Sequence, residues 1–167
     1  MSDFPAALES ERALLGAMLV EDDFVYQLSD QLLPEDFYGE DNRKVFRTGI
    51  TLAGQSKPVE TITVIQNCKG VHPSYISDLT TGVPPKKFLE HHIKNVREKS
   101  NLRRLLNSLR EVTNAIADGA LTVDEAVSKA QQAVFSIEAD VTESTIRSAS
   151  ICGTVELQSL PHAEVRA

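Results

Sequence analysis

The stretch LPEDFYGEDNRKVF, residues 33–46, holds the densest group of side chains that could do chemistry: four carboxylates and two cations in fourteen positions. Carboxylates that face a cleft can bind a divalent cation or transfer a proton. The stretch lacks the alternating ligand spacing of a calcium loop, and acidic residues near a helix start compensate the helix dipole. We therefore expect Glu35, Asp36, Glu40 and Asp41 to cap and solvate helix ends and to bind no metal.

Two other patterns resemble a phosphate-binding loop and a metal-binding histidine pair, but each departs from the pattern that its chemistry requires. GITLAGQS, from Gly49 to Ser56, matches a phosphate-binding loop except that Gln55 replaces the lysine, and its glycines fall within and just after an expected helix. His91 and His92 are adjacent, so on a helix they point about 100° apart and converge poorly on one ion. We expect one of these rings to be packed and the other solvated. The sequence therefore predicts no catalytic residue, no cofactor and no metal.

Length and composition favour an all-α protein that forms either one domain or one domain with an extension. The chain has 167 residues, no tryptophan and 5% aromatic residues, which suits helix packing better than an aromatic-rich sheet. Cys68 and Cys152 lie far apart and in no metal-binding spacing, so reduced thiols are expected. No apolar run is long enough for a signal peptide or a membrane span. We expect a cytoplasmic protein without membrane contact.

Apolar residues recur at helical spacing through the first half of the chain. Asp3 followed by Pro5 is a start signal for the first helix. We expect Asp41 or Asn42 to cap the third helix and Gly54 to end it in the left-handed region. The expected elements are helices over 6–20 and 22–30, the helix ending at Gly54, a brief helix or extended piece over 62–66, and a helix over 75–81.

From Lys86 to about Ala117 the apolar repeat is unbroken by proline or glycine, which predicts one helix of about 46 Å. Asp118 and Gly119 are then expected to form a turn, and Thr122 with Glu125 a capping box. The helix that follows should turn Val127, Ala130, Val134 and Ile137 back toward the long helix, forming an antiparallel hairpin. The segment 141–167 is rich in small polar residues and is interpreted as a linker or tail, with one short helix over 155–160.

Charge is distributed unevenly along the chain. Residues 86–110 contain eight Lys or Arg against two Glu, a local charge of +6, whereas the formal charge of the whole chain is -7. The remaining residues therefore sum to 9 minus 22, or -13. Two interpretations stay open for this basic segment: a solvated helix face paired with acidic neighbours, or a surface for nucleic-acid phosphate or an acidic protein.

The order of several motifs resembles the N-terminal domain of DnaB-type replicative DNA helicases over about residues 7–140. The corresponding pieces are ALESERALLGAML, LLPEDFYGEDNRKVF, LAGQSKPVETITV, YISDLTTGVP, the run from His91 to Arg104, and AQQAVFSIEA. The chain departs from the family pattern at Asn42, where the family has His, and at Glu60, where it has Asp. The segment between Ile65 and Tyr75 is also shorter than is typical, and the ATPase half with its phosphate loop is missing.

The resemblance implies a globular helical head, residues 1–96, a protruding helical hairpin, residues 97–140, and the linker from residue 141. Asp36, Phe37 and Tyr38 would lock the turn between two head helices, with the rings of Phe37 and Phe46 in the core. The residues expected to contact another subunit or a partner are Arg103, Arg104, Leu106, Leu109, Arg110, Val127 and Val134.

The function implied is oligomerisation and partner docking without catalysis for a replicative helicase, with this chain either a fragment that ends in the interdomain linker or a module encoded alone. The expected partners are further copies of the chain, as a dimer, a trimer of dimers or a hexameric collar, together with primase and a helicase loader. DNA would be contacted only through the missing motor domain, which in a longer parent would be an ATP-dependent helicase. The alternatives are a stand-alone phage or plasmid regulator that mimics the collar, direct nucleic-acid binding, and an unrecognised enzyme.

Overall fold

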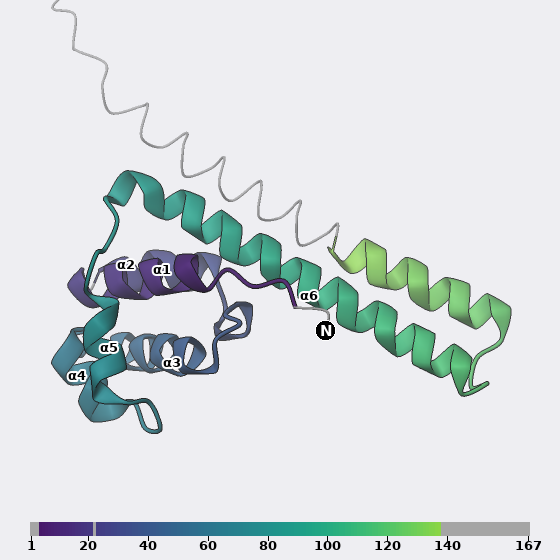
Figure 1. Cartoon of the computed structure of the whole chain (residues 1–167), viewed down its shortest axis with the longest axis horizontal. Coiled ribbons are helices and arrows are strands. Elements are labelled where there is room, and N and C mark those ends of the chain that lie inside the picture. Colours follow the sequence, from purple (N-terminus) through teal and green to yellow (C-terminus); the bar gives the residue numbers. More distant parts are fainter. Residues whose placement is uncertain (1–3, 22, 138–167) are drawn as a thin grey trace, which may run out of the picture. The chain divides into compact units, whose positions relative to one another are not determined.

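The chain is all-α, as expected: in this computed structural model, residues 4–21 and 23–137 are described, and they form helices and no strand. The chain divides into two compact units, Met1–Leu106 and a second that begins at Asn107. The first unit contains α1 (Leu8–Val20), α2 (Phe24–Gln31), the short 3₁₀ turn η1 (Pro34–Asp36), α3 (Glu40–Gly54), α4 (Thr61–Asn67) and α5 (Pro73–Leu79). The long helix α6 (Leu89–Ala117), preceded by η2 (Lys86–Phe88), begins in the first unit and ends in the second (Figure 1).

Helix α1 is the central element of the first unit. It packs against α2, α3 and α5, and Leu14, Leu15 and Met18 on it are completely buried. Because neighbours lie on several sides of α1, its apolar face is broad and includes Leu14 and Met18. This burial is the main source of stability in the first unit.

Two helix ends differ from the sequence-based expectations. Helix α3 ends at Gly54 as expected, but the left-handed residue is Ser56, with a φ of 55°, and Gly54 is not in that region. Helix α5 begins earlier than the expected residue 75, because Pro73 occupies its first turn and the His72 ring accepts a hydrogen bond from the backbone N–H of Ser74 at 3.3 Å. The start signal expected at Asp3 lies outside the described residues.

The second unit is a pair of helices joined by a short turn. Gly119 has a φ of 66°, so the expected turn forms, and the residues 123–137 are helical. The expected capping box is present: the Glu125 carboxylate accepts from the backbone N–H of Thr122 at 2.9 Å, and the Thr122 hydroxyl accepts from that of Glu125 at 3.4 Å. No helix among the described residues has the length and apolarity needed to cross a membrane. The predicted linker beyond residue 140 lies outside the described residues, and the predicted boundary at 96/97 stays a prediction.

Replacing Gly16 with Ala should destabilise the first unit. A Cβ at this position would lie 2.2 Å from the backbone oxygen of Leu79 and 3.0 Å from Cγ2 of Val83, so α1 and α5 would have to separate. We expect a loss of about 1–3 kcal/mol, which exceeds the gain in helix propensity. Gly54→Ala is the matched control, because nothing lies within 4 Å of its Cβ and the substitution should be neutral or slightly stabilising. Urea unfolding followed by circular dichroism measures both; equal midpoints for the two variants would contradict the close approach.

His92 should make stability depend on pH near neutrality. Its Nδ1 lies 3.1 Å from the Ser10 hydroxyl, and burial, followed by the charge of His91, lowers the pKa of His92. The unfolded chain therefore takes up the proton first as the pH falls, so the contribution is present above about 6.5 and is lost on acidification. Urea midpoints measured between pH 7.5 and 5.5 should fall less for His92→Asn than for the parent chain. His91→Asn, at an exposed position, should keep most of the parent slope; an unchanged slope in His92→Asn would contradict this assignment.

Candidate interaction surface and the buried polar anchors

The acidic stretch that resembled a site closes a turn. At the end of η1, the Asp36 carboxylate accepts a hydrogen bond from the backbone N–H of Leu33 at 2.7 Å and one from the Ser100 hydroxyl of α6 at 2.6 Å. An Arg104 nitrogen lies 3.4 Å from the same carboxylate. Asp36 is only 7% exposed, so these contacts hold its carboxylate inside the fold. The carboxylate of Asp36 therefore fixes α6 to the turn.

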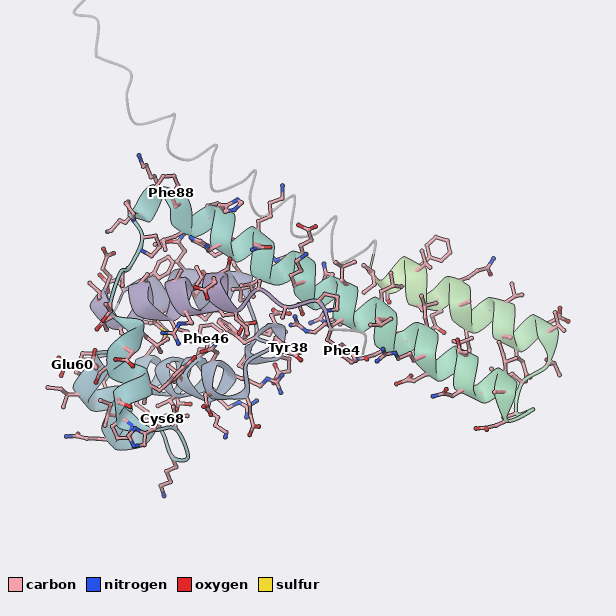
Figure 2. The ribbon with its side chains drawn as sticks, viewed as in Figure 1. Phe4, Tyr38, Phe46, Glu60, Cys68 and Phe88 are labelled. Carbon is pink, nitrogen blue, oxygen red and sulfur yellow. The ribbon has the colours of Figure 1, made fainter. Side chains whose placement is uncertain are left out.

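The aromatic residues of this stretch have different environments. The rings of Phe37 and Phe46 are fully buried with centroids 4.7 Å apart, and Phe46 lies among the packed helices in Figure 2. Tyr38 is exposed, and the guanidinium carbon of Arg103 lies 5.5 Å from its ring centroid. The two buried rings are part of the core, and Tyr38 covers the guanidinium of Arg103 from the solvent side.

A buried carboxylate from α1 caps α3. Glu11 has no solvent exposure, and its carboxylate accepts from the backbone N–H groups of Tyr38 at 2.6 Å and Gly39 at 3.1 Å and from Nδ2 of Asn42 at 2.8 Å. The Tyr75 hydroxyl donates to Oδ1 of Asn42. Tyr38 and Gly39 immediately precede the first residue of α3, so the negative charge of Glu11 lies at the N-terminus of this helix, where the helix dipole favours it.

The prediction that Asp41 or Asn42 caps α3 is therefore wrong. The helix begins at Glu40, with Gly39 in the capping position, so Asn42 lies inside the first turn with its side chain buried. Its amide must donate to Glu11 and accept from Tyr75 at the same time, which explains why a group with both capacities suits this position. Sequence reasoning missed Glu11, because nothing in its own helix distinguishes it from the other acids.

Several basic residues of the segment 86–110 are engaged inside the first unit. Arg97 donates to the backbone oxygen of Gln31, and Arg103 donates to the backbone oxygens of Pro5, at 2.8 Å, and Asp36. Arg103 is only 9% exposed, and burial lowers the pKa of its guanidinium. Arg103 and Arg104 were expected to contact a partner, but the structure places both beside Asp36. The basic segment is thus less available to phosphate than its formal charge suggests.

The remaining interface candidates lie on the second unit or next to it. Leu109, Val127 and Val134 are 39%, 52% and 46% exposed, Arg110 is exposed and Leu106 is half-buried. Val127 and Val134 were expected to turn back toward the long helix, which is wrong. Ala130 and Ile137, which the same prediction included, are half-buried, and Ala133 is the most buried residue of this helix at 8% exposure. Phe135, 66% exposed, is a further apolar residue of this surface that sequence reasoning missed.

The glycines, histidines and cysteines that the sequence analysis considered as possible site residues have these positions in the structure. Gly49 lies within α3, and a Cβ there would come 2.8 Å from the Met18 sulfur, so this glycine lets α1 and α3 approach closely. The rings of His91 and His92 are 5.8 Å apart between centroids, and His91 is exposed. Cys68 is a buried free thiol, while Cys152 lies outside the described residues. Within residues 4–21 and 23–137, no group of three or more potential ligands is arranged to hold a metal ion.

Glu11→Gln should destabilise the first unit strongly although it keeps the shape of the side chain. The carboxamide loses the charge and turns one acceptor into a donor that faces other donors, so a buried N–H group is left without a partner. The expected loss is about 2–4 kcal/mol. Glu9→Gln, an exposed acid in the same turn of α1, is the control and should change the free energy of unfolding by less than about 0.5 kcal/mol. Equal urea midpoints for the two variants would rule out the capping role.

Comparison with known proteins identifies the relatives of this chain. Residues 3–98 match the family model described as "DnaB-like helicase N terminal domain". The chain is 34% identical over 130 residues to the replicative DNA helicase DnaB of Geobacillus stearothermophilus, covering 72% of this chain and 28% of that relative. It is 30% identical over 145 residues to the replicative DNA helicase DnaC of Bacillus subtilis (strain 168), covering 80% and 31%. The chain therefore spans less than a third of the length of these relatives.

A solved structure shows the same fold. The crystal structure of the N-terminal domain of DnaB helicase from Mycobacterium tuberculosis matches with a TM-score of 0.71 and 26% sequence identity, covering 80% of this chain and 99% of that chain. Together with a family match that covers more than half of the sequence, this similarity confirms the resemblance inferred from the motifs. The chain belongs to the DnaB-like helicase N-terminal domain family.

Proposed function

We propose that this chain is a non-catalytic self-association and partner-docking module of a replicative DNA helicase, acting in DNA replication. The curated relatives carry the name replicative DNA helicase, and the chain corresponds to the N-terminal part of such a protein. The observation that carries the proposal is the apolar surface of the second unit, which a two-helix unit cannot bury by itself.

The spacing of the exposed residues supports pairing between helices. Leu102, Leu109 and Ile116 on α6 are exposed and recur at every seventh position. Val127 and Val134 are also seven residues apart on the helix of residues 123–137. An apolar repeat of seven keeps one face of a helix toward a partner helix over several turns. We assign Leu106, Leu109, Arg110, Val127 and Val134 to this surface and leave Arg103 and Arg104 in their anchoring role.

A second copy of this chain is the first partner that we propose, because the same surface on two subunits can cover itself about a two-fold axis. Dimers of this kind could assemble into a trimer of dimers or a hexameric collar. Primase and a helicase loader are proposed as further partners of the assembled surface, and DNA is proposed to be contacted through a motor domain that this chain does not include. The cytoplasm is the proposed location.

Charging the exposed surface should abolish self-association. In Leu109→Asp/Val134→Asp, two carboxylates would be buried in the pairing interface, and we expect the dissociation constant to rise at least about 100-fold. Ile62→Asp is the control, because Ile62 is an exposed apolar residue of α4, a helix of the first unit. Sedimentation velocity over a concentration series measures the three proteins. A parent chain that stays monomeric at the highest concentration would refute the self-association proposal.

A further inference from the structure

We infer that the helices of the second unit are stable only when a partner copy covers their exposed apolar residues, so that folding of this unit and pairing of the chain form one coupled step. This inference rests on the proposed self-association. It adds a conformational consequence: the first unit is folded in the monomer, and residues 107–137 become ordered as copies associate.

The first observation is that the two helices bury little apolar surface against each other. The covered or half-covered positions are Ser108, Val112 and Ala115 on α6, Leu121 in the turn, and Ala126, Ala130, Ala133 and Ile137 on the helix of residues 123–137. Only Ala133 among them is buried. Removing one methyl group from water contributes roughly 0.8 kcal/mol, whereas ordering each residue costs about 1–2 kcal/mol of backbone entropy. The contacts within this unit are therefore too few to stabilise it alone.

The second observation is an open groove between the same two helices. It has a volume of about 380 Å³, and polar groups form most of its lining: Ser108, Glu111, Lys129, Gln132 and Ser136. Protein cores are filled with interdigitating apolar side chains and leave few voids larger than a water molecule. A groove lined by hydroxyl, amide and charged groups is the surface of a helix pair that has not formed a core of its own.

The third observation is the distribution of apolar residues. In the first unit Phe37, Phe46 and Leu14 are fully buried. In the second unit, Val127, Val134 and Phe135 are exposed instead. Burying a large apolar side chain contributes about 1.5–3 kcal/mol, so the stabilisation available to this unit is realised only when something covers these residues.

Loss of the partner copy should destabilise the two helices of the second unit to different degrees. The first part of α6 is anchored by Ser100 and Arg103, so its turns beyond Leu106 extend a helix that already exists. The residues 123–137 must nucleate a helix of their own, and isolated helices of 12–15 residues are marginal in water. Protection of backbone amides should therefore decline gradually along the end of α6 and be lowest over residues 123–137.

Hydrogen–deuterium exchange on the full chain tests the inference. In the monomeric variant Leu109→Asp/Val134→Asp, amides of residues 123–137 should exchange within about 10-fold of the rates of an unfolded chain, while those of α1 and α3 stay at least about 100-fold slower. In the parent chain and in Ile62→Asp, protection of residues 123–137 should rise with concentration in parallel with the associated fraction from sedimentation. Residues 123–137 that stay as protected as α3 in a monomeric sample would overturn the inference.

The outcomes separate this inference from the proposed function. If the parent chain associates while protection of residues 123–137 does not change with concentration, self-association stands and coupled folding is refuted. If the parent chain never associates, the proposed function fails. Coupled folding then fails with it, because no associated state exists in which residues 123–137 become ordered; failure of coupled folding alone is recognised by the first outcome.

Discussion

The buried carboxylate of Glu11 is the interaction on which the first unit depends, because it joins three helices at one point. It lies on α1, caps the start of α3 through two backbone N–H groups, and reaches Tyr75 of α5 through Asn42. Burying a charge costs several kcal/mol unless strong donors replace the lost water, and here three donors do so. The same hydrogen bonds fix the position of the turn that precedes α3. The Glu11 carboxylate therefore sets the geometry of this part of the acidic stretch, residues 33–46.

Asp36, at the other side of that turn, is a second buried carboxylate that joins separate elements of the fold. Its carboxylate accepts a hydrogen bond from Ser100 and lies beside Arg104, and its backbone oxygen accepts one from Arg103. The middle of α6 is therefore attached to the turn by polar contacts as well as by apolar packing. Some cations of the basic segment, residues 86–110, are therefore held in contacts within the fold. A local charge of +6 in the sequence is therefore a poor guide to surface potential, since hydrogen bonds to backbone oxygens hold some of that charge inside the fold.

The first unit buries its large apolar residues and the second unit exposes them, and the proposed function is based on this difference. The first unit buries its large side chains in one core, whereas the second keeps valines and Phe135 exposed and packs alanines between its helices. Small residues between two helices let them approach closely but bury little area. Membership of the DnaB-like helicase N-terminal domain family supports the proposed role of this exposed surface in assembly. The small apolar contact between the two helices is the basis for the inferred link between assembly and folding.

The sequence by itself determined the all-α class, most helix positions, the turn at Asp118–Gly119 and the capping box at Thr122, because these depend on periodicity and on residues within one or two turns of each other. It also indicated the family through the order of its motifs. Only the tertiary structure decided that Glu11 is buried, that Asn42 is an internal bridge, that Arg103 is an anchor and that Val127 and Val134 face solvent. Each of these depends on groups supplied by a distant part of the chain, such as the N–H groups of Tyr38 and Gly39, and a local pattern carries no information about which distant group will arrive.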